Sequence, residues 1–397
     1  MLALSRSASA EASPAQPVRV ESIDFLRGLI MVIMALDHTR AFLSNVQFDP
    51  TDLSQTTPAF FLTRWVTHFC APGFVFLAGT AAFLYGSKGK TNAELSRFLL
   101  TRGLWLILLE LTFIRCFGWN MNFNYASTNA GVIWAIGWSM VALAVLIHFP
   151  KWFIALVGLG MICFHNLMDD LTADSFVAYR WVWAILHDPA NLEFTSGKFF
   201  NTQYPLIPWI GVMACGYIFG AIFQSNQGVR KAVLIRIGIF AILLFFLLRI
   251  INLYGDPHVW SVQKNPLFTI FSFVNAEKYP PSLIFLLMTL GPVLLALGLL
   301  DRQFGKVGKF FITYGRVPLF YYLLHLPLLR IIVIIVALSK YGAGVLSLKT
   351  DEAPPGWGFN LPIIYLIWIG VIIILYPACR WFSEVKKRKQ GAWLSYL

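Results

Sequence analysis

Long apolar segments alternate with short polar ones along most of the chain. The stretches that contain no Lys, Arg, Asp or Glu include residues 203–223, 237–248, 281–300, 317–329 and 361–379. Runs of about 18 or more apolar residues are long enough to cross a bilayer as helices, and a soluble core does not need them. The pattern therefore predicts membrane-spanning helices.

Ten spans are predicted from these stretches and their more polar neighbours. They cover residues 22–44, 66–86, 97–117, 131–149, 152–168, 204–224, 236–254, 281–300, 312–338 and 361–382. The ninth span contains Pro327, and a proline usually kinks a membrane helix, so this span is either one bent helix or two. The longest polar insert is 169–203. The predicted class is therefore an all-α, polytopic membrane protein with about ten transmembrane helices and no sizeable soluble domain.

Composition and charge also predict how the chain is oriented in the membrane. The chain is 58% hydrophobic and 13% charged, whereas a soluble domain usually has about 25% charged residues. With the N-terminus inside, the inner side carries 20 of the 31 Lys and Arg residues and 6 of the 19 acidic residues. Because cytoplasmic loops are rich in Lys and Arg, both termini are predicted to be cytoplasmic. The net charge of +12 then reflects membrane orientation, and no nucleic-acid partner is expected.

The termini and the known motifs narrow the picture further. Residues 1–20 lack a continuous apolar stretch and are interpreted as a disordered cytoplasmic tail, not a cleaved signal. Residues 21–385 are assigned to the membrane domain and 386–397 to a basic cytoplasmic tail. The five cysteines are scattered without metal-ligand spacing, and no metal is expected. The sequence has no Walker, dinucleotide-binding, HExxH or GxSxG motif, so ATP-driven transport and the familiar hydrolases have no support.

Ionisable residues at membrane depth are candidates for function because they are costly unless paired or hydrated. In the first span, Arg27 and His38 are 11 residues apart, which places them about 16 Å apart on one helix face. Asp24 lies one turn before Arg27 and can pair with it. An anchoring ion pair plus a packed histidine explains the same pattern, so the two interpretations stay open.

Several later spans carry similar candidates. Arg64 and His68 share a helix face at the outer end of the second span. Arg97 and Arg102 lie at the inner start of the third, where flanking cations are expected in any case. His325 lies near mid-membrane in an apolar helix, where a structural hydrogen bond is an equal explanation.

Three polar residues near the end of the third span are ambiguous. Glu110 and Arg115 are deep enough in the span that we expect them to pair, for structure or for function. Asn120 lies in the short loop that follows and is a candidate for an acceptor site, although ordinary turn residues look the same.

Two motifs near the N-terminus resemble a known family. Ser22–Gly28 reads SIDFLRG, an apolar helix follows, and Pro72–Gly79 reads PGFVFLAG. This combination resembles the beginning of the heparan-alpha-glucosaminide N-acetyltransferase catalytic family. Tyr279–Leu283 and Pro318–His325 resemble the bacterial members of that family. The resemblance extends over residues 19–382.

The resemblance implies an acyltransferase with acetyl-CoA as the cytoplasmic donor and a sugar, amine or hydroxyl acceptor on the far side. Arg97 and Arg102, together with Arg27, would then hold the phosphate groups of CoA. The spacing of Arg27 and His38 is also similar to that of the type-three acyltransferases, and His38 would be the general base.

One departure from the family concerns this base. In the lysosomal enzyme the catalytic histidine lies in the loop between the first two helices, but residues 45–65 contain no histidine here. His38 and His68 flank that loop, and either is a candidate. The other predicted members of the site are polar residues nearby: Asp37 to stabilise the imidazolium, and Arg64, Asn120 and His325 as substrate-binding residues.

Other functions and settings stay open at this level. A secondary transporter would use the same buried charges as a proton relay, although no inverted repeat is evident. A non-catalytic scaffold for envelope assembly is a third interpretation. The family branch suggests a bacterial inner membrane, where the acceptor would be an envelope glycan, and homo-oligomerisation is left open.

Overall fold

The computed structural model describes residues 20–121, 123–343, 354–389 and 394. The predicted N-terminal tail therefore lies, except for Val20, outside the described residues. Helices make up 72% of the described residues, so a mainly α-helical class is confirmed. The α-helices are α1 (Glu21–Leu43), α2 (Pro58–Thr67), α3 (Cys70–Gly86), α4 (Asn92–Leu109), α5 (Val132–Leu146), α6 (Lys151–Phe164), α7 (Arg180–Leu186), α8 (Leu206–Phe219), α9 (Gln227–Ile251), α10 (Pro266–Val274), α11 (Leu283–Leu299), α12 (Lys306–Arg316), α13 (Pro318–Tyr341) and α14 (Leu361–Arg388).

Each predicted span coincides with one of these helices or with two adjacent ones. Five short helical segments extend or join them: η1 (Glu110–Asn120), η2 (His165–Met168), η3 (Ala173–Ser175), η4 (Val177–Tyr179) and η5 (Gly220–Gln224). Among the described residues, six helical stretches are long and apolar enough to cross a membrane. They are Pro58–Gly86, Lys151–Met168, Leu206–Gln224, Gln227–Ile251, Pro318–Tyr341 and Leu361–Arg388. The chain is thus an integral membrane protein, and the number of ten spans stays a prediction.

The ninth predicted span is divided, but not at Pro327. The break falls at Val317, between α12 and α13, and Pro327 lies inside α13. Val317 has φ −133° and ψ 48°, outside the helical region. The physical reason is Pro318, because the ring of a proline disfavours the helical conformation in the residue before it.

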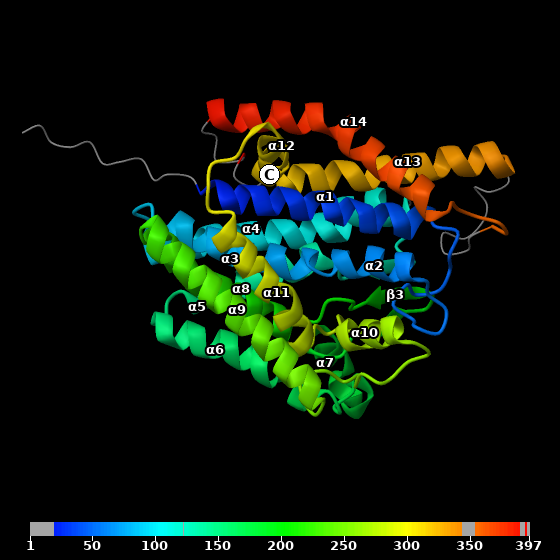
Figure 1. Ribbon diagram of the computed structural model, residues 1–397. Helices are drawn as coiled ribbons and strands as arrows, with labels where there is room; N and C mark the ends of the chain where they lie inside the picture. Colours follow the sequence, from blue (N-terminus) through cyan, green and yellow to red (C-terminus); the bar gives the residue numbers. More distant parts are fainter. Residues whose placement is uncertain (1–19, 122, 344–353, 390–393, 395–397) are drawn as a thin grey trace, which may run out of the picture.

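A small sheet departs from the all-α prediction. Its strands are β1 (Ser127–Asn129), β2 (Asn191–Thr195) and β3 (Lys198–Asn201), in the order β1-β3-β2. β2 and β3 form an antiparallel hairpin, whereas β1 pairs with β3 in parallel. Figure 1 shows β3 near α7 and α10 at one end of the helical bundle. The long insert 169–203 is therefore partly ordered as a cap on this end.

α1 lies inside the bundle and packs against α3, α12, α13 and α14. In Figure 1 it lies between α14 on one side and α3 and α4 on the other. Its contact with α12 depends on Gly28 and Gly315: a Cβ on Gly28 would overlap the carbonyl oxygen of Phe311, and a Cβ on Gly315 would overlap that of Asp24. Small residues allow such close backbone contact between membrane helices. The glycine of the SIDFLRG motif is thus explained by packing.

Candidate active site

A cavity of about 1300 Å³ begins at the end of the bundle where α1 starts. Eight of its lining residues are Lys or Arg and three are Asp or Glu. Arg230 pairs with Asp301 at 2.8 Å, and Arg316 lies 3.8 Å from Asp24. The other lining cations are Arg27, Lys88, Arg102, Arg302, Lys309 and Lys386. The mouth of the cavity therefore has a positive excess suited to a polyanionic ligand.

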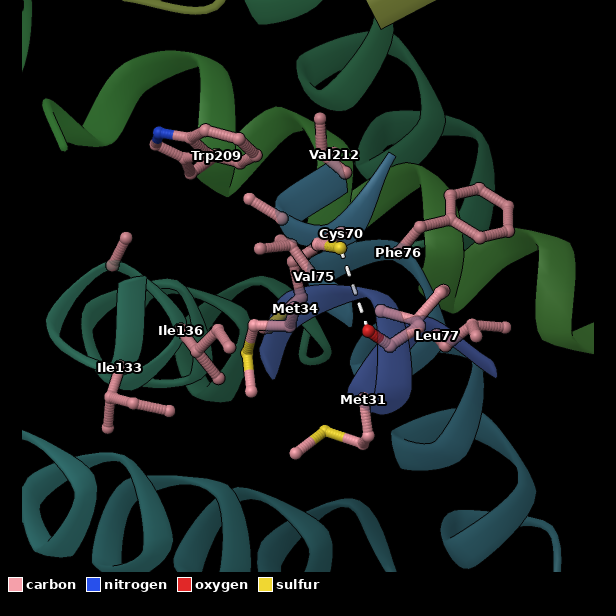
Figure 2. Packing of buried hydrophobic residues seen from close by; sticks show 14 of the residues in the cluster. Met31, Met34, Cys70, Val75, Phe76, Leu77, Ile133, Ile136, Trp209 and Val212 are labelled. Carbon is pink, nitrogen blue, oxygen red and sulfur yellow. Dashed lines mark hydrogen bonds between the residues drawn. The ribbon is translucent and has the colours of Figure 1, made fainter. Parts of the chain in front are cut away.

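The inner part of the cavity is apolar. Met31 and Met34 from α1 and Ile133 and Ile136 from α5 contribute to its walls. Figure 2 shows these four side chains in one packed cluster. Tyr322 of α13 also lines this part. A long ligand with a charged end and a less polar arm therefore fits the cavity.

A pair of histidines lies next to Tyr322. Nδ1 of His38 and Nε2 of His325 are 2.7 Å apart, and the two rings stack with their centroids 5.0 Å apart. The ring centroid of Tyr322 lies 6.1 Å from that of His38 and 5.3 Å from that of His325. Because Tyr322 also lines the cavity, the pair lies beside the inner end of the cavity.

The hydrogen bonds of this pair define its tautomers. Nδ1 of His325 lies 3.1 Å from the carbonyl oxygen of Tyr321, and a carbonyl oxygen only accepts, so this nitrogen donates. Nε2 of His325 then carries a lone pair and accepts from Nδ1 of His38. Nε2 of His38 consequently keeps its own lone pair. This is the arrangement of an oriented general base.

Asp37, the sequence neighbour of His38, takes part in a different interaction. Its carboxylate accepts from Arg64 at 2.6 Å and from Arg40 at 3.0 Å, and all three side chains are less than one fifth exposed. Tyr279 lies next to Arg64. Burial by itself would raise the pKa of the Tyr279 hydroxyl, but the positive charges of Lys278 and Arg64 lower this pKa below its usual value. The result is a buried polar network at the C-terminal end of α1.

His68 and Asn120 were also predicted to belong to the site. His68 is 3% exposed, packs against Phe285 and belongs to the surroundings of Arg64, while its Nδ1 has no hydrogen-bond partner. Asn120 is the last residue of η1, and its side chain lies outside the described residues. The structure thus brings together His38 and His325, and separately Asp37 and Arg64.

The three predicted phosphate-binding arginines differ in position. Arg27 and Arg102 line the cavity, and Arg27 also donates to the carbonyl oxygen of Leu77 at 2.7 Å. Arg97 is exposed and is not part of the cavity lining. Arg97 and Arg102 are five positions apart on α4, about 140° around the helix, so their side chains point toward different surroundings.

Two aromatic residues contribute to the site without having been predicted. Trp119 packs edge-on against His38 with the ring centroids 5.3 Å apart, and Tyr322 contacts both histidines. Tyr322 lies three residues before His325, which places both on one helix face. This three-residue spacing from His325 could have identified Tyr322 as a member of the site from the sequence. Nothing in the sequence indicated Trp119.

Glu110 and Arg115 have different partners, contrary to the expected pairing. The carboxylate of Glu110 lies against Gly131 at the start of α5, where the backbone N–H groups of Ile133 and Trp134 stabilise it. Arg115 donates to the carbonyl oxygen of Ser127 at 3.0 Å and lies over the ring of Tyr125. Both groups thus have local partners, although Oε2 of Glu110 is buried without a hydrogen-bond partner.

Comparison with known proteins gives one family. The model described as heparan-alpha-glucosaminide N-acetyltransferase, catalytic, matches residues 19–250, which is more than half of the chain. The match includes α1 with His38 and the whole of α4 with Arg102, whereas His325 lies beyond it. No curated protein matches the chain.

Proposed function

Because the chain belongs to the family of the heparan-alpha-glucosaminide N-acetyltransferase catalytic domain, we propose that it transfers the acetyl group of cytoplasmic acetyl-CoA to an acceptor across the membrane. The observation that carries this proposal is the His38–His325 pair beside the inner end of a cavity with a cationic mouth. The acceptor is a sugar, amine or hydroxyl on the extracytoplasmic side. Acetyl-CoA is the co-substrate, and the protein is multi-pass in a bacterial inner membrane.

The shape and charge of the cavity support acetyl-CoA as the donor. CoA carries its phosphate groups at one end and its thioester at the other, with the pantetheine arm between them. Arg27 and Arg102 at the mouth would bind the phosphates by charge-assisted hydrogen bonds. The arm would then pass along Met31 and Met34 toward Tyr322, which brings the thioester near the histidines.

His38 is the group that accepts the proton of the acceptor. Nε2 of His38 removes this proton while the acceptor nitrogen or oxygen attacks the thioester carbonyl carbon. The bond between carbon and sulfur breaks, the acetyl group stays on the acceptor, and CoA leaves as the thiolate, which takes up the proton. His325 holds His38 in the tautomer that this step requires. Arg64 and its neighbours at the outer end of α1 face the acceptor.

A covalent route uses the same atoms. If Nε2 of His38 attacks the thioester first, an acetyl-histidine forms and CoA leaves before the acceptor binds. Steady-state kinetics separate the two routes, because a covalent intermediate gives parallel lines in double-reciprocal plots and direct transfer gives intersecting lines.

The first experiment measures CoA release by the purified, tag-free protein with glucosamine as the probe acceptor. We expect release of the free thiol by the wild type and by His148→Ala, since His148 is exposed and lies outside the site. His38→Ala should lose activity by roughly 100- to 10,000-fold, the usual contribution of a general base. If His38→Ala retained full activity, His38 would not be the base.

The same preparation distinguishes the alternatives. A transporter would move protons or solute without consuming acetyl-CoA, and a scaffold would do neither. If the protein did not bind CoA at all, the donor site would be wrong. Mass spectrometry of envelope glycans from cells with and without the protein then identifies the acceptor as the glycan whose acetylation disappears.

A further inference from the structure

A second group of polar side chains lies outside the cavity, at the end of α6 and after α7. It consists of His165 in η2, Asp169 directly after η2, and His187 directly after α7. One ligand atom from each side chain lies within 4.8 Å of the other two. Two imidazoles and a carboxylate are ligands that zinc prefers. The folded chain thus brings residues from both sides of a 17-residue segment to one point.

The burial of these groups makes their hydrogen bonding informative. His165 is 1% exposed, and neither of its ring nitrogens has a hydrogen-bond partner of good geometry. The backbone carbonyl of Pro281 lies close enough to the ring to accept a weak hydrogen bond from it. Oδ1 of Asp169 is also buried without a hydrogen-bond partner. Buried polar atoms nearly always have partners, so the unpartnered ring of His165 and Oδ1 of Asp169, which belong to one cluster, point to a missing ligand.

We propose that His165, Asp169 and His187 form a binding site for a zinc ion. Nitrogen and oxygen ligands lie about 2.0–2.2 Å from zinc, so the ligand atoms of a tetrahedral site are roughly 3.3 Å apart. Side-chain shifts of about an ångström close the observed triangle around an ion. A water molecule takes the fourth position.

The surrounding hydrogen bonds support these three side chains as ligands. Nδ2 of Asn166 donates to Oδ2 of Asp169 at 2.8 Å, which leaves Oδ1 for the metal. Nε2 of His187 donates to the carbonyl oxygen of His165 at 3.0 Å and lies 3.6 Å from Oδ1 of Asp169. To bind zinc through Nε2, the ring exchanges this hydrogen bond for the ion and takes the tautomer with its proton on Nδ1. Oδ1 of Asn166 accepts from the backbone N–H of Leu283 at 2.9 Å. Such outer partners orient metal ligands and hold them in place.

The zinc ion would join the end of α6 to the end of α7. Through Asn166 it would also be connected to the first residue of α11. The segment 169–187 contains only short helices, so a metal bridge across it stabilises this cap on the bundle. Binding of zinc to the folded state alone raises the stability of that state.

The test measures zinc retained by tag-free protein that has been stripped with a chelator, exchanged into chelator-free buffer, incubated with zinc chloride and desalted. We expect one zinc per chain for the wild type. His187→Gln and Asp169→Asn each remove a ligand and should retain less than about one tenth of that amount. His148→Gln is the matched control, because this exposed histidine lies outside the cluster, and it should retain one zinc.

Thermal unfolding of the same samples shows whether a lost site reflects a lost fold. Zinc should raise the midpoint of the wild type and of His148→Gln and leave that of Asp169→Asn unchanged. Asp169→Asn preserves the shape of the side chain, so it carries the test if His187→Gln does not fold. The proposal is overturned if stripped wild type retains no zinc, or if Asp169→Asn retains as much as the wild type.

Discussion

Most ionisable side chains within the helical bundle are satisfied by a specific local partner. Arg249, at the end of α9, is 1% exposed and donates to the carbonyl oxygens of His258, Ser272, Phe273 and Asn275, which holds the loop after α9 and the end of α10 in place. Asp37 is held by Arg64 and Arg40. The His38–His325 pair differs from both, because its hydrogen bonds end with a lone pair on Nε2 of His38 that no structural contact uses. A base is therefore the best explanation of this pair.

His325 should act through His38, and substitutions that differ in hydrogen bonding test this. His325→Leu removes the acceptor for Nδ1 of His38 and should lower kcat by about 10- to 100-fold, with the KM for acetyl-CoA unchanged. His325→Gln keeps an acceptor oxygen and should recover part of the loss. Steady-state kinetics of both variants give the measurement. Equal losses in both variants would indicate that His325 only fills space.

Substitution of the two arginines of α4, Arg97 and Arg102, should affect the binding of acetyl-CoA differently. Arg102→Ala removes a cation from the cavity mouth and should raise the KM for acetyl-CoA about tenfold, as expected for one charge-assisted hydrogen bond. Arg97→Ala should leave the KM unchanged, since Arg97 lies outside the cavity lining. The effect of Arg102→Ala should diminish at high salt. A larger effect of Arg97→Ala would contradict this placement of the CoA phosphates.

The sequence indicated the candidate residues separately but not how they combine. His38 and His325 were both identified because ionisable groups are costly at membrane depth. Their pairing joins positions 287 residues apart, and no local pattern encodes such a contact. Asp37 was assigned to His38 because it is adjacent in sequence, whereas successive residues on a helix point in different directions. Its observed partner, Arg64, is 27 residues away.

At the level of elements, hydropathy located the helices well and their interruptions poorly. Each charge-free stretch contains or overlaps a helix, because backbone groups in a bilayer must be satisfied within the segment. The break at Val317 depends on the residue before a proline, which a hydropathy average does not register. The three-stranded sheet forms from strands of three to five residues, too short for a period-two pattern to be recognised.

The crossing of α1 and α12 should depend on the absence of a side chain at Gly28. Gly28→Ala places a Cβ against the carbonyl oxygen of Phe311, and a backbone atom cannot turn away as a side chain can. We expect destabilisation of about 1–3 kcal/mol or more, typical of overpacking, measured as a lower unfolding midpoint in detergent. Gly370→Ala on α14 is the control, because its Cβ would have nothing within 4 Å. A neutral Gly28→Ala would show that the two helices can separate freely.

For the whole molecule, the orientation in the membrane and the direction of transfer depend on the same charges. The Lys and Arg residues that predict the inner side include the cations of the cavity mouth, among them Lys88, Arg302 and Lys309. The polar network of Asp37 and Arg64 lies toward the other end of α1. A chain inserted the opposite way would open the cavity toward the exterior, where acetyl-CoA is not supplied.

Labelling of introduced cysteines tests this orientation. Ser87→Cys, in the exposed turn after α3, should react with a membrane-impermeant maleimide only after the cells are lysed. Ser261→Cys, in the exposed loop between α9 and α10, should react in intact cells whose outer barrier has been made permeable. The wild type gives the background, because its five cysteines are buried or partly buried. Labelling of Ser87→Cys from outside would place the cavity mouth on the exterior. Because acetyl-CoA is cytoplasmic, that single result would rule out the proposed direction of transfer even if the purified protein released CoA.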